Sequence, residues 1–114
     1  MTDCLFCQMA SGLIRPNVVL ETEAVLAFRD IHPQAPVHIL VIPKRHVTTF
    51  DRLPVEAPEL AGALFAAVRE VVCLEGLEDS GYRVVANAKE DGGQTVHHLH
   101  LHVLGGRVLR WPPG

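Results

Sequence analysis

The chain has 114 residues, a length typical of one domain with its own hydrophobic core. It is 48% hydrophobic and 20% charged, as in ordinary globular proteins. Its net charge of −3 gives no general attraction to nucleic acid or to an anionic membrane surface, so we expect neither as a partner. Three cysteines do not make an even disulfide framework, and the N-terminus carries no signal-peptide pattern. We therefore expect a cytoplasmic protein.

Apolar segments separated by turn residues predict five short strands and one long helix. The predicted strands span residues 17–21, 24–29, 37–43, 82–87 and 97–104. Residues 56–74 carry apolar side chains at helical spacing, with Pro58 in the first turn and Gly76 at the C-terminal end. Residues 89–94 are predicted as a loop. Most connections are too short for parallel crossovers, which predicts an α+β fold with a five-stranded antiparallel sheet.

The most unusual segment is TVHHLHLHVLGG, residues 95–106, which holds four of the seven histidines. On a strand, alternate side chains share a face, so His98, His100 and His102 point one way. His97 falls on the opposite face and is read as structural. The three histidines that share a face stand about 6.6–6.8 Å apart along such a strand.

Three interpretations of this row follow from the residues alone. The row is an exposed strand face, a catalytic metal site with an open position, or a nucleophile with neighbouring helpers. The preceding DGGQT segment, residues 91–95, favours a ligand, because glycine amides can approach an oxyanion closely. The row and this turn together indicate a phosphate site.

Residues 94–104 resemble the signature of the histidine triad (HIT) family, His-φ-His-φ-His-φ-φ with φ apolar. Residues 27–47 and the tail 105–114 resemble the histidine triad nucleotide-binding (Hint) branch of that family. The resemblance implies a single HIT domain over residues 1–114. It also implies a homodimer with a continuous sheet, in which Trp111 and its tail lie near the partner's active site.

The resemblance further implies a purine nucleoside phosphoramidase that cleaves AMP or GMP amides in two steps without a catalytic cofactor. His100 matches the nucleophile that forms a nucleotidyl-histidine. By position, the matching helpers are His98 and Thr95 near the leaving amine, His102 and Gln94 around the phosphate, and His38 as a fourth histidine. Thr95 stands where the family commonly has serine. The alternatives are a nucleotide-binding regulatory protein and a zinc-dependent hydrolase.

The nucleotide pocket is implied in the same way. Asp30 matches the acid that accepts hydrogen bonds from both ribose hydroxyls, and Asn87 matches a polar residue near the phosphate. The residues that match the apolar walls around the purine are Phe6, Met9, Phe28 and Ile31. Without the resemblance, these apolar residues would be read as core and Asp30 as a turn cap.

Cys4 and Cys7 form a C-x-x-C pair that no thioredoxin-like pattern surrounds. The resemblance implies a structural zinc site, completed by His46 and His98. The alternative is a pair of free thiols near the purine wall. Cys73, within the predicted helix, is expected to be an inert core thiol.

Overall fold

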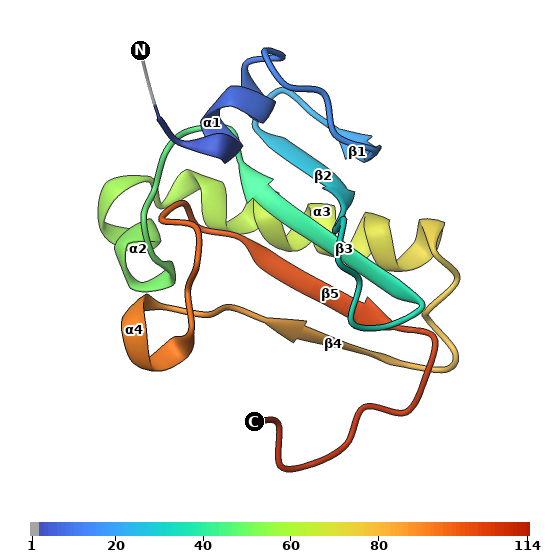
Figure 1. Ribbon diagram of the computed structural model, residues 1–114. Coiled ribbons are helices and arrows are strands. Elements are labelled where there is room, and N and C mark those ends of the chain that lie inside the picture. The colour runs from blue at the N-terminus through green and yellow to red at the C-terminus, as the bar shows by residue number, and fades with distance from the viewer. Residues whose placement is uncertain (1–2) are drawn as a thin grey trace.

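The computed structural model describes residues 3–114, and its strands form one antiparallel sheet (Figure 1). The elements are α1 (Leu5–Ala10), β1 (Val18–Glu21), β2 (Val25–Arg29), β3 (Val37–Pro43), a 3-10 turn (Phe50–Arg52), α2 (Leu53–Glu56), α3 (Glu59–Leu74), β4 (Tyr82–Val85), α4 (Lys89–Gly92) and β5 (Leu101–Gly105). The sheet order is β1-β2-β3-β5-β4, and every neighbouring pair is antiparallel. The predicted α+β fold class is confirmed. No helix within residues 3–114 is long and apolar enough to cross a membrane.

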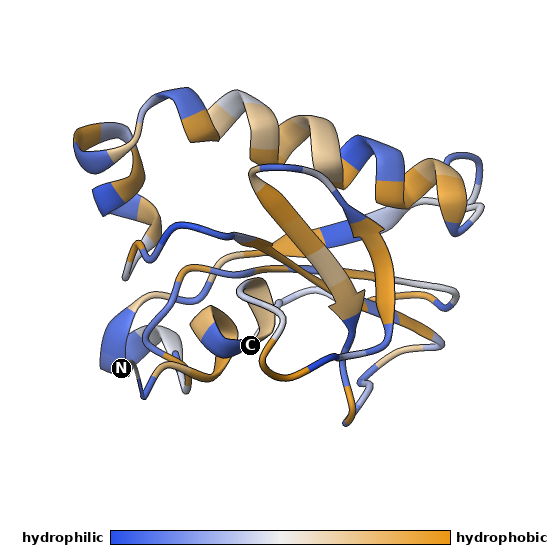
Figure 2. Cartoon of the chain, turned by 90° about the horizontal axis from the view of Figure 1, so that it is seen from above, coloured by the Kyte–Doolittle hydropathy of each residue, from blue (hydrophilic) through white to orange (hydrophobic). Residues whose placement is uncertain are grey.

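The long helix α3 covers one face of the sheet, and the N-terminal segment lies against the other (Figure 2). Leu60, Leu64 and Val71 of α3 are buried at helical spacing and pack with Ile39 and Val103 of the sheet. The helix ends at a left-handed glycine, Gly76, as predicted. This layer is the main hydrophobic core.

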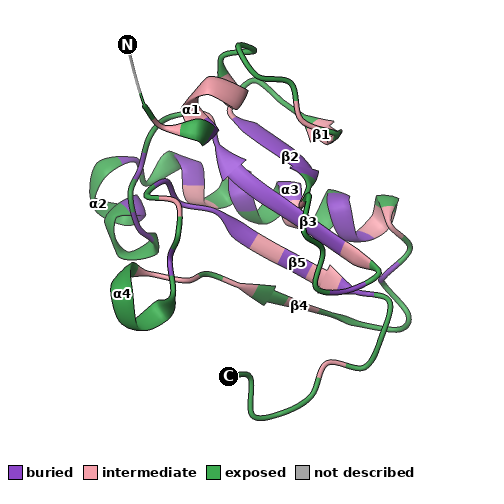
Figure 3. Ribbon diagram, viewed as in Figure 1, coloured by how far each residue is buried: buried purple, intermediate pink, exposed green. Residues whose placement is uncertain are grey.

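A second, smaller core lies on the opposite face of the sheet. Leu40 and Ile42 of β3 pack there with Leu26 and Phe28 of β2, and Phe6 of α1 covers them. The central strands β2 and β3 are therefore buried on both faces, whereas the edge strand β4 stays partly exposed (Figure 3). This second face carries the histidines.

The predicted fifth strand is too long, because β5 begins at Leu101 and residues 97–100 lie outside the ladder. The Leu99 amide donates instead to the Val47 carbonyl, with 2.6 Å between nitrogen and oxygen. That bond draws the segment toward the chain after β3. The alternation of side chains persists, because Leu99 is still buried in the main core and His98 faces the smaller one.

Other differences concern short helices and element ends. The predicted helix over 56–74 begins only at Glu59, because Ala57 leaves the helical region and separates α2 from α3. The predicted loop over 89–94 contains α4, and the fourth strand ends at Val85 rather than at residue 87. Helix α1 has six residues, too few to show a helical period in the sequence, and was not predicted.

Candidate active site and metal cluster

The histidine row separates by burial. His98 and His100 are buried, His102 is half-buried, and His97 is exposed. The rings of His98 and His100 both pack edge-on against Phe6, with centroids 5.9 and 5.1 Å away. The intervening Leu99 joins the core under α3. The row therefore presents three imidazoles to the same face.

Main-chain carbonyls fix the tautomers of the first two histidines. The Nε2 atom of His98 lies 2.8 Å from the Pro43 carbonyl oxygen, so Nε2 carries the proton and Nδ1 carries the lone pair. The Nδ1 atom of His100 lies 2.7 Å from the His98 carbonyl oxygen, so here Nδ1 donates. The Nε2 atom of neutral His100 is consequently an unprotonated nitrogen with a free lone pair.

A chain of two hydrogen bonds orients His102. The Gln34 amide donates to Nδ1 of His38 at 3.0 Å, which leaves the proton of neutral His38 on Nε2. That Nε2 lies 2.9 Å from Nδ1 of His102, so His102 carries its own proton on Nε2. Within residues 3–114 this buried Nε2 has no hydrogen-bond partner. A buried donor without a partner is the group that a bound oxyanion would satisfy.

Burial favours the neutral form of His38, His98 and His102. It lowers the pKa of His98 and of His102 to about 4, and neighbouring imidazoles push both in the same direction. Burial also lowers the pKa of His38, although the nearby Asp30 carboxylate partly opposes this. Neutral rings at neutral pH are what the hydrogen-bond pattern requires.

A cavity of about 400 Å³ opens beside the row, a size typical of small-molecule sites. Many of the predicted site residues line it, namely Phe6, Met9, Phe28, Asp30, Ile31, Thr95, His100 and His102. His38 and His98 lie behind this lining and orient His102 and His100. The structure thus brings apolar walls, one carboxylate and two imidazoles to a single cavity.

Asp30 serves the turn and the cavity at once. Its Oδ1 accepts a hydrogen bond from the His32 amide at 2.8 Å, which is the turn-cap role read from the sequence. Its Oδ2 lies 3.5 Å from Nε2 of His38 and belongs to a half-buried side chain. Because the cap uses one oxygen, the carboxylate still presents the other to the cavity.

Two predicted nucleotide contacts, Gln94 and Asn87, are not in the lining of the cavity, and a third, Ile31, lies at its rim. Gln94 is buried and donates both amide protons, to the carbonyls of Thr48 and Val96, so it holds its loop and has no proton left for a phosphate. Asn87 does not line the cavity, and Ile31 is 86% exposed at its rim.

Cys4, Cys7, His46 and His98 form a cluster whose ligand atoms all lie within 4.8 Å of one another. The Cys4 sulfur is 3.3 Å from Nδ1 of His98, and the Cys7 sulfur is 3.2 Å from Nδ1 of His46. Two sulfurs and two imidazoles are a tetrahedral metal-ligand set. Nδ1 of His98 is unprotonated, and its Nε2 donates to the Pro43 carbonyl, an arrangement common for metal-bound histidine. The cluster can hold a metal ion.

Asp30, His38 and His102 form a second group with ligand atoms equally close. The Gln34 amide occupies the Nδ1 lone pair of His38, so the nitrogen facing His102 carries a proton. A metal ion would have to displace that proton. This group is therefore a hydrogen-bond relay.

Several lining residues were not predicted. They are Leu5, Ile14, Arg15, Pro16, Arg29, Leu40 and Val96. Strand alternation could have found Leu40, because it lies two residues from His38 on the same strand face. The residues from the N-terminal segment had no periodic signal.

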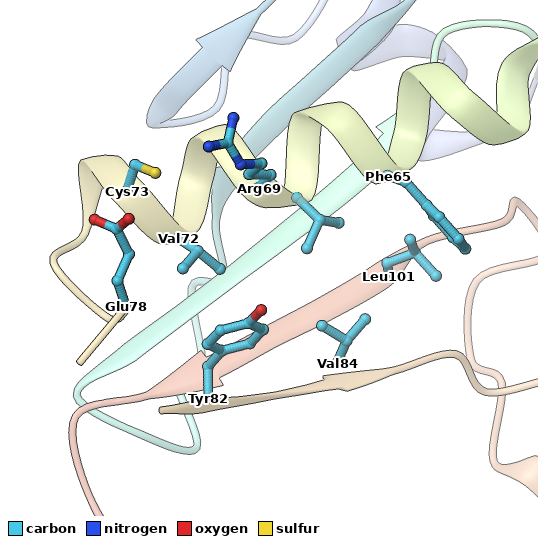
Figure 4. Close-up of a pocket in the computed structure, with 9 residues that line it drawn as sticks. Phe65, Arg69, Val72, Cys73, Glu78, Tyr82, Val84 and Leu101 are labelled. Atoms are coloured by element: carbon cyan, nitrogen blue, oxygen red, sulfur yellow. The ribbon is translucent and has the colours of Figure 1, made fainter. Parts of the chain in front are cut away.

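A larger cavity, of about 520 Å³, lies between α3 and β4 and contains no histidine (Figure 4). Phe65, Tyr82 and Val84 form much of its wall. Cys73 is half-buried there and not in the core, and a hydrogen bond with Glu78 raises the pKa of its thiol. Size alone does not identify a chemical site, and the smaller cavity is the one that imidazoles line.

The HIT domain family model matches residues 12–109. The chain belongs to the HIT family. An uncharacterised HIT-like protein of Synechococcus elongatus is 47% identical over 112 residues, which cover 98% of this chain and 97% of that protein. Among solved structures, a HIT family hydrolase from Legionella pneumophila is 47% identical, with a TM-score of 0.94 over 98% of this chain and 100% of its own. A histidine triad protein from Clostridium difficile is 38% identical, with a TM-score of 0.91 over 96% of each chain.

Acid should destabilise the metal-free protein in a histidine-dependent way. The unfolded histidines bind protons below about pH 6.5, whereas folded His98 and His102 stay neutral to about pH 4. The contribution of these two histidines to the unfolding free energy is therefore fully present above pH 6.5 and is lost as the pH falls toward 4. Urea titrations at pH 7 and pH 5 should show the unfolding free energy fall by about 2–4 kcal/mol.

The matched variants for this measurement are His102→Asn and His97→Asn. The first should remove about half of the pH dependence, and the exposed His97 should change none of it. An unfolding free energy that is equal at pH 7 and pH 5 would contradict the neutral, buried imidazoles.

Proposed function

We propose that this HIT-family chain is a purine nucleoside phosphoramidase that hydrolyses AMP or GMP amides through a nucleotidyl-histidine on His100. The observation that carries the proposal is the tautomer of that residue. Its Nδ1 donates to the His98 carbonyl, so the lone pair of Nε2 is available beside a cavity large enough for a nucleotide. The likeness to a HIT family hydrolase supports a hydrolytic reaction.

Substrate binding uses the lining of the cavity. The purine lies among Phe6, Met9 and Phe28, where aromatic and flexible apolar side chains suit a flat base. Asp30 accepts hydrogen bonds from the ribose hydroxyls through Oδ2, the oxygen that the turn cap does not use. The phosphate accepts a hydrogen bond from the Nε2–H of His102, which completes the relay from the Gln34 amide.

In the first step, Nε2 of His100 attacks the α-phosphorus and the bond from phosphorus to the leaving nitrogen breaks. The leaving amine takes a proton from solvent at the open side of the cavity. We assign the contact with this amine to the hydroxyl of the exposed Thr95. His98 cannot supply that proton, because its only N–H is bound to the Pro43 carbonyl. In the second step, water attacks the phosphorus of the nucleotidyl-histidine and the bond from phosphorus to Nε2 of His100 breaks. The electron pair returns to Nε2, the water's proton goes to solvent, and the nucleoside monophosphate is released.

Replacing the nucleophile should abolish turnover. His100→Ala is expected to lower the release of AMP from adenosine 5′-phosphoramidate by about 10³-fold or more. Chromatographic assay of AMP measures this, and intact mass should detect a nucleotidyl adduct on the wild type alone. His97→Ala, on the exposed side of the row, should keep the wild-type rate.

Wild-type activity in His100→Ala would refute the nucleophile. AMP binding without any turnover in the wild type would make the protein a nucleotide-binding protein instead of an enzyme.

We assign zinc to the cluster of Cys4, Cys7, His46 and His98. Zinc prefers thiolate and imidazole ligands in closed tetrahedral sites, where it is structural. Such an ion would join the N-terminal segment to the histidine row. The reaction itself then needs no catalytic cofactor.

Metal content should depend on two cysteines and not on the third. Wild-type protein and Cys73→Ser should each bind about one zinc ion per chain, whereas Cys4→Ser should lose it. Elemental analysis of dialysed protein measures this. Zinc retained at full occupancy by Cys4→Ser would show that the ion binds elsewhere.

We also propose that the chain is a single domain over residues 1–114, cytoplasmic, and a homodimer whose sheets join at β4. Support comes from the partly exposed edge strand and from the apolar cavity between β4 and α3, where Phe65, Tyr82 and Val84 are exposed. The Arg83 guanidinium donates to the carbonyls of Leu109 and Arg110 and so holds the tail beside this edge. The exposed Trp111 then lies within reach of the partner's site.

A further inference from the structure

Helix α1 belongs to the metal cluster and to the nucleotide cavity at the same time. Cys4 caps the helix and Cys7 lies within it, so one helical turn supplies both sulfurs of the cluster. The same helix supplies Leu5, Phe6 and Met9 to the wall of the cavity. Any shift of α1 relative to the sheet would therefore change both sites together.

This helix is too short to hold its own position. Six residues form fewer than two turns, and isolated helices of that length are unstable in water. Its end is tied to the chain that follows directly, through bonds from the amides of Ser11, Gly12 and Leu13 to carbonyls of the helix. Buried Phe6 and the contacts of the two sulfurs with His46 and His98 bring it against the sheet.

The cluster reaches the reacting nitrogen from the other side as well. His98 lies 3.3 Å from the Cys4 sulfur through Nδ1, and its carbonyl oxygen accepts the Nδ1 proton of His100. Phe6, located between the two cysteines, packs its ring 5.1 Å from that of His100. Two short paths thus run from the cluster to His100.

We propose that the metal ion at Cys4, Cys7, His46 and His98 and the nucleotide in the cavity bind cooperatively, because the ion pins α1 where it forms the base wall. This rests on the proposed function, in which the cavity takes a purine nucleotide. Coupling between two sites typically changes affinity by about 5–150-fold. Linkage requires the nucleotide to raise the affinity for the metal by the same factor.

The first measurement is AMP binding by titration calorimetry, on zinc-loaded and on chelator-stripped wild-type protein. Stripping should weaken AMP binding by about tenfold. A competition titration of zinc against a chromophoric chelator, with and without saturating AMP, should give the same factor. Equal AMP affinity in the two forms would overturn the proposal.

Two variants separate the ion from the cavity. His46→Gln removes an exposed ligand that does not line the cavity. AMP should therefore bind this variant as weakly as it binds stripped wild-type protein. Adding zinc at a concentration that loads only the intact cluster should not restore AMP binding to the variant. His97→Gln changes an exposed histidine outside both sites and should behave as the wild type. Tight AMP binding by metal-free His46→Gln would contradict the linkage.

Amide hydrogen exchange without nucleotide distinguishes failure of the linkage from failure of the proposed function. Zinc should slow exchange in residues 5–10 and leave exchange in α3 unchanged. Protection of α1 in zinc-loaded protein that binds no AMP would refute the proposed function, although the metal ion would still hold α1 in place. If removal of zinc speeds exchange equally in α1 and α3, the ion stabilises the whole chain. The proposal that it holds α1 specifically would then be wrong.

Discussion

Two hydrogen bonds from imidazole rings to main-chain carbonyls govern the chemistry of the histidine row. His98 donates from Nε2 to Pro43, and His100 donates from Nδ1 to His98, so two histidines that share a face adopt opposite tautomers. The first consequently turns its lone pair toward the sulfurs of Cys4 and Cys7, and the second keeps a lone pair on Nε2 for a reacting atom. One row can thereby combine a metal ligand with a nucleophile.

The sheet makes those bonds possible. Pairing of β3 with β5 sets Leu40 opposite His102 and brings His38 diagonally beside it, within hydrogen-bond distance. The row leaves the ladder before Leu101, which frees the His98 carbonyl to accept from the ring of His100. Burial lowers the pKa of His98 and of His102, so the neutral forms of these two rings persist at neutral pH. Register, burial and hydrogen bonding support the same arrangement.

The sequence predicted what depends on periodicity. Alternation placed His98, His100 and His102 on one face, and helical spacing found α3 and its terminal Gly76. Helix α1 could not be predicted, because a six-residue helix is too short to show a periodic pattern of apolar residues. The sequence also could not predict three details of the site, because each depends on atoms that only the folded chain brings together. They are the histidine tautomers, the two hydrogen bonds donated by the Gln94 amide, and the use of Asp30 in both the turn and the cavity. The resemblance supplied residue roles that spacing alone left open, and the hydrogen bonds of the Gln94 amide to two carbonyls are a detail that the resemblance did not indicate.

Nitrogen NMR measures the tautomers of the row directly. A two-bond proton–nitrogen correlation spectrum of ¹⁵N-histidine protein at neutral pH, assigned with His98→Gln and His100→Gln, resolves the protonated nitrogen of each ring. We expect a proton on Nε2 of His98 and on Nδ1 of His100. A proton on Nε2 of neutral His100 would rule out the proposed nucleophile, because that nitrogen could not then attack phosphorus.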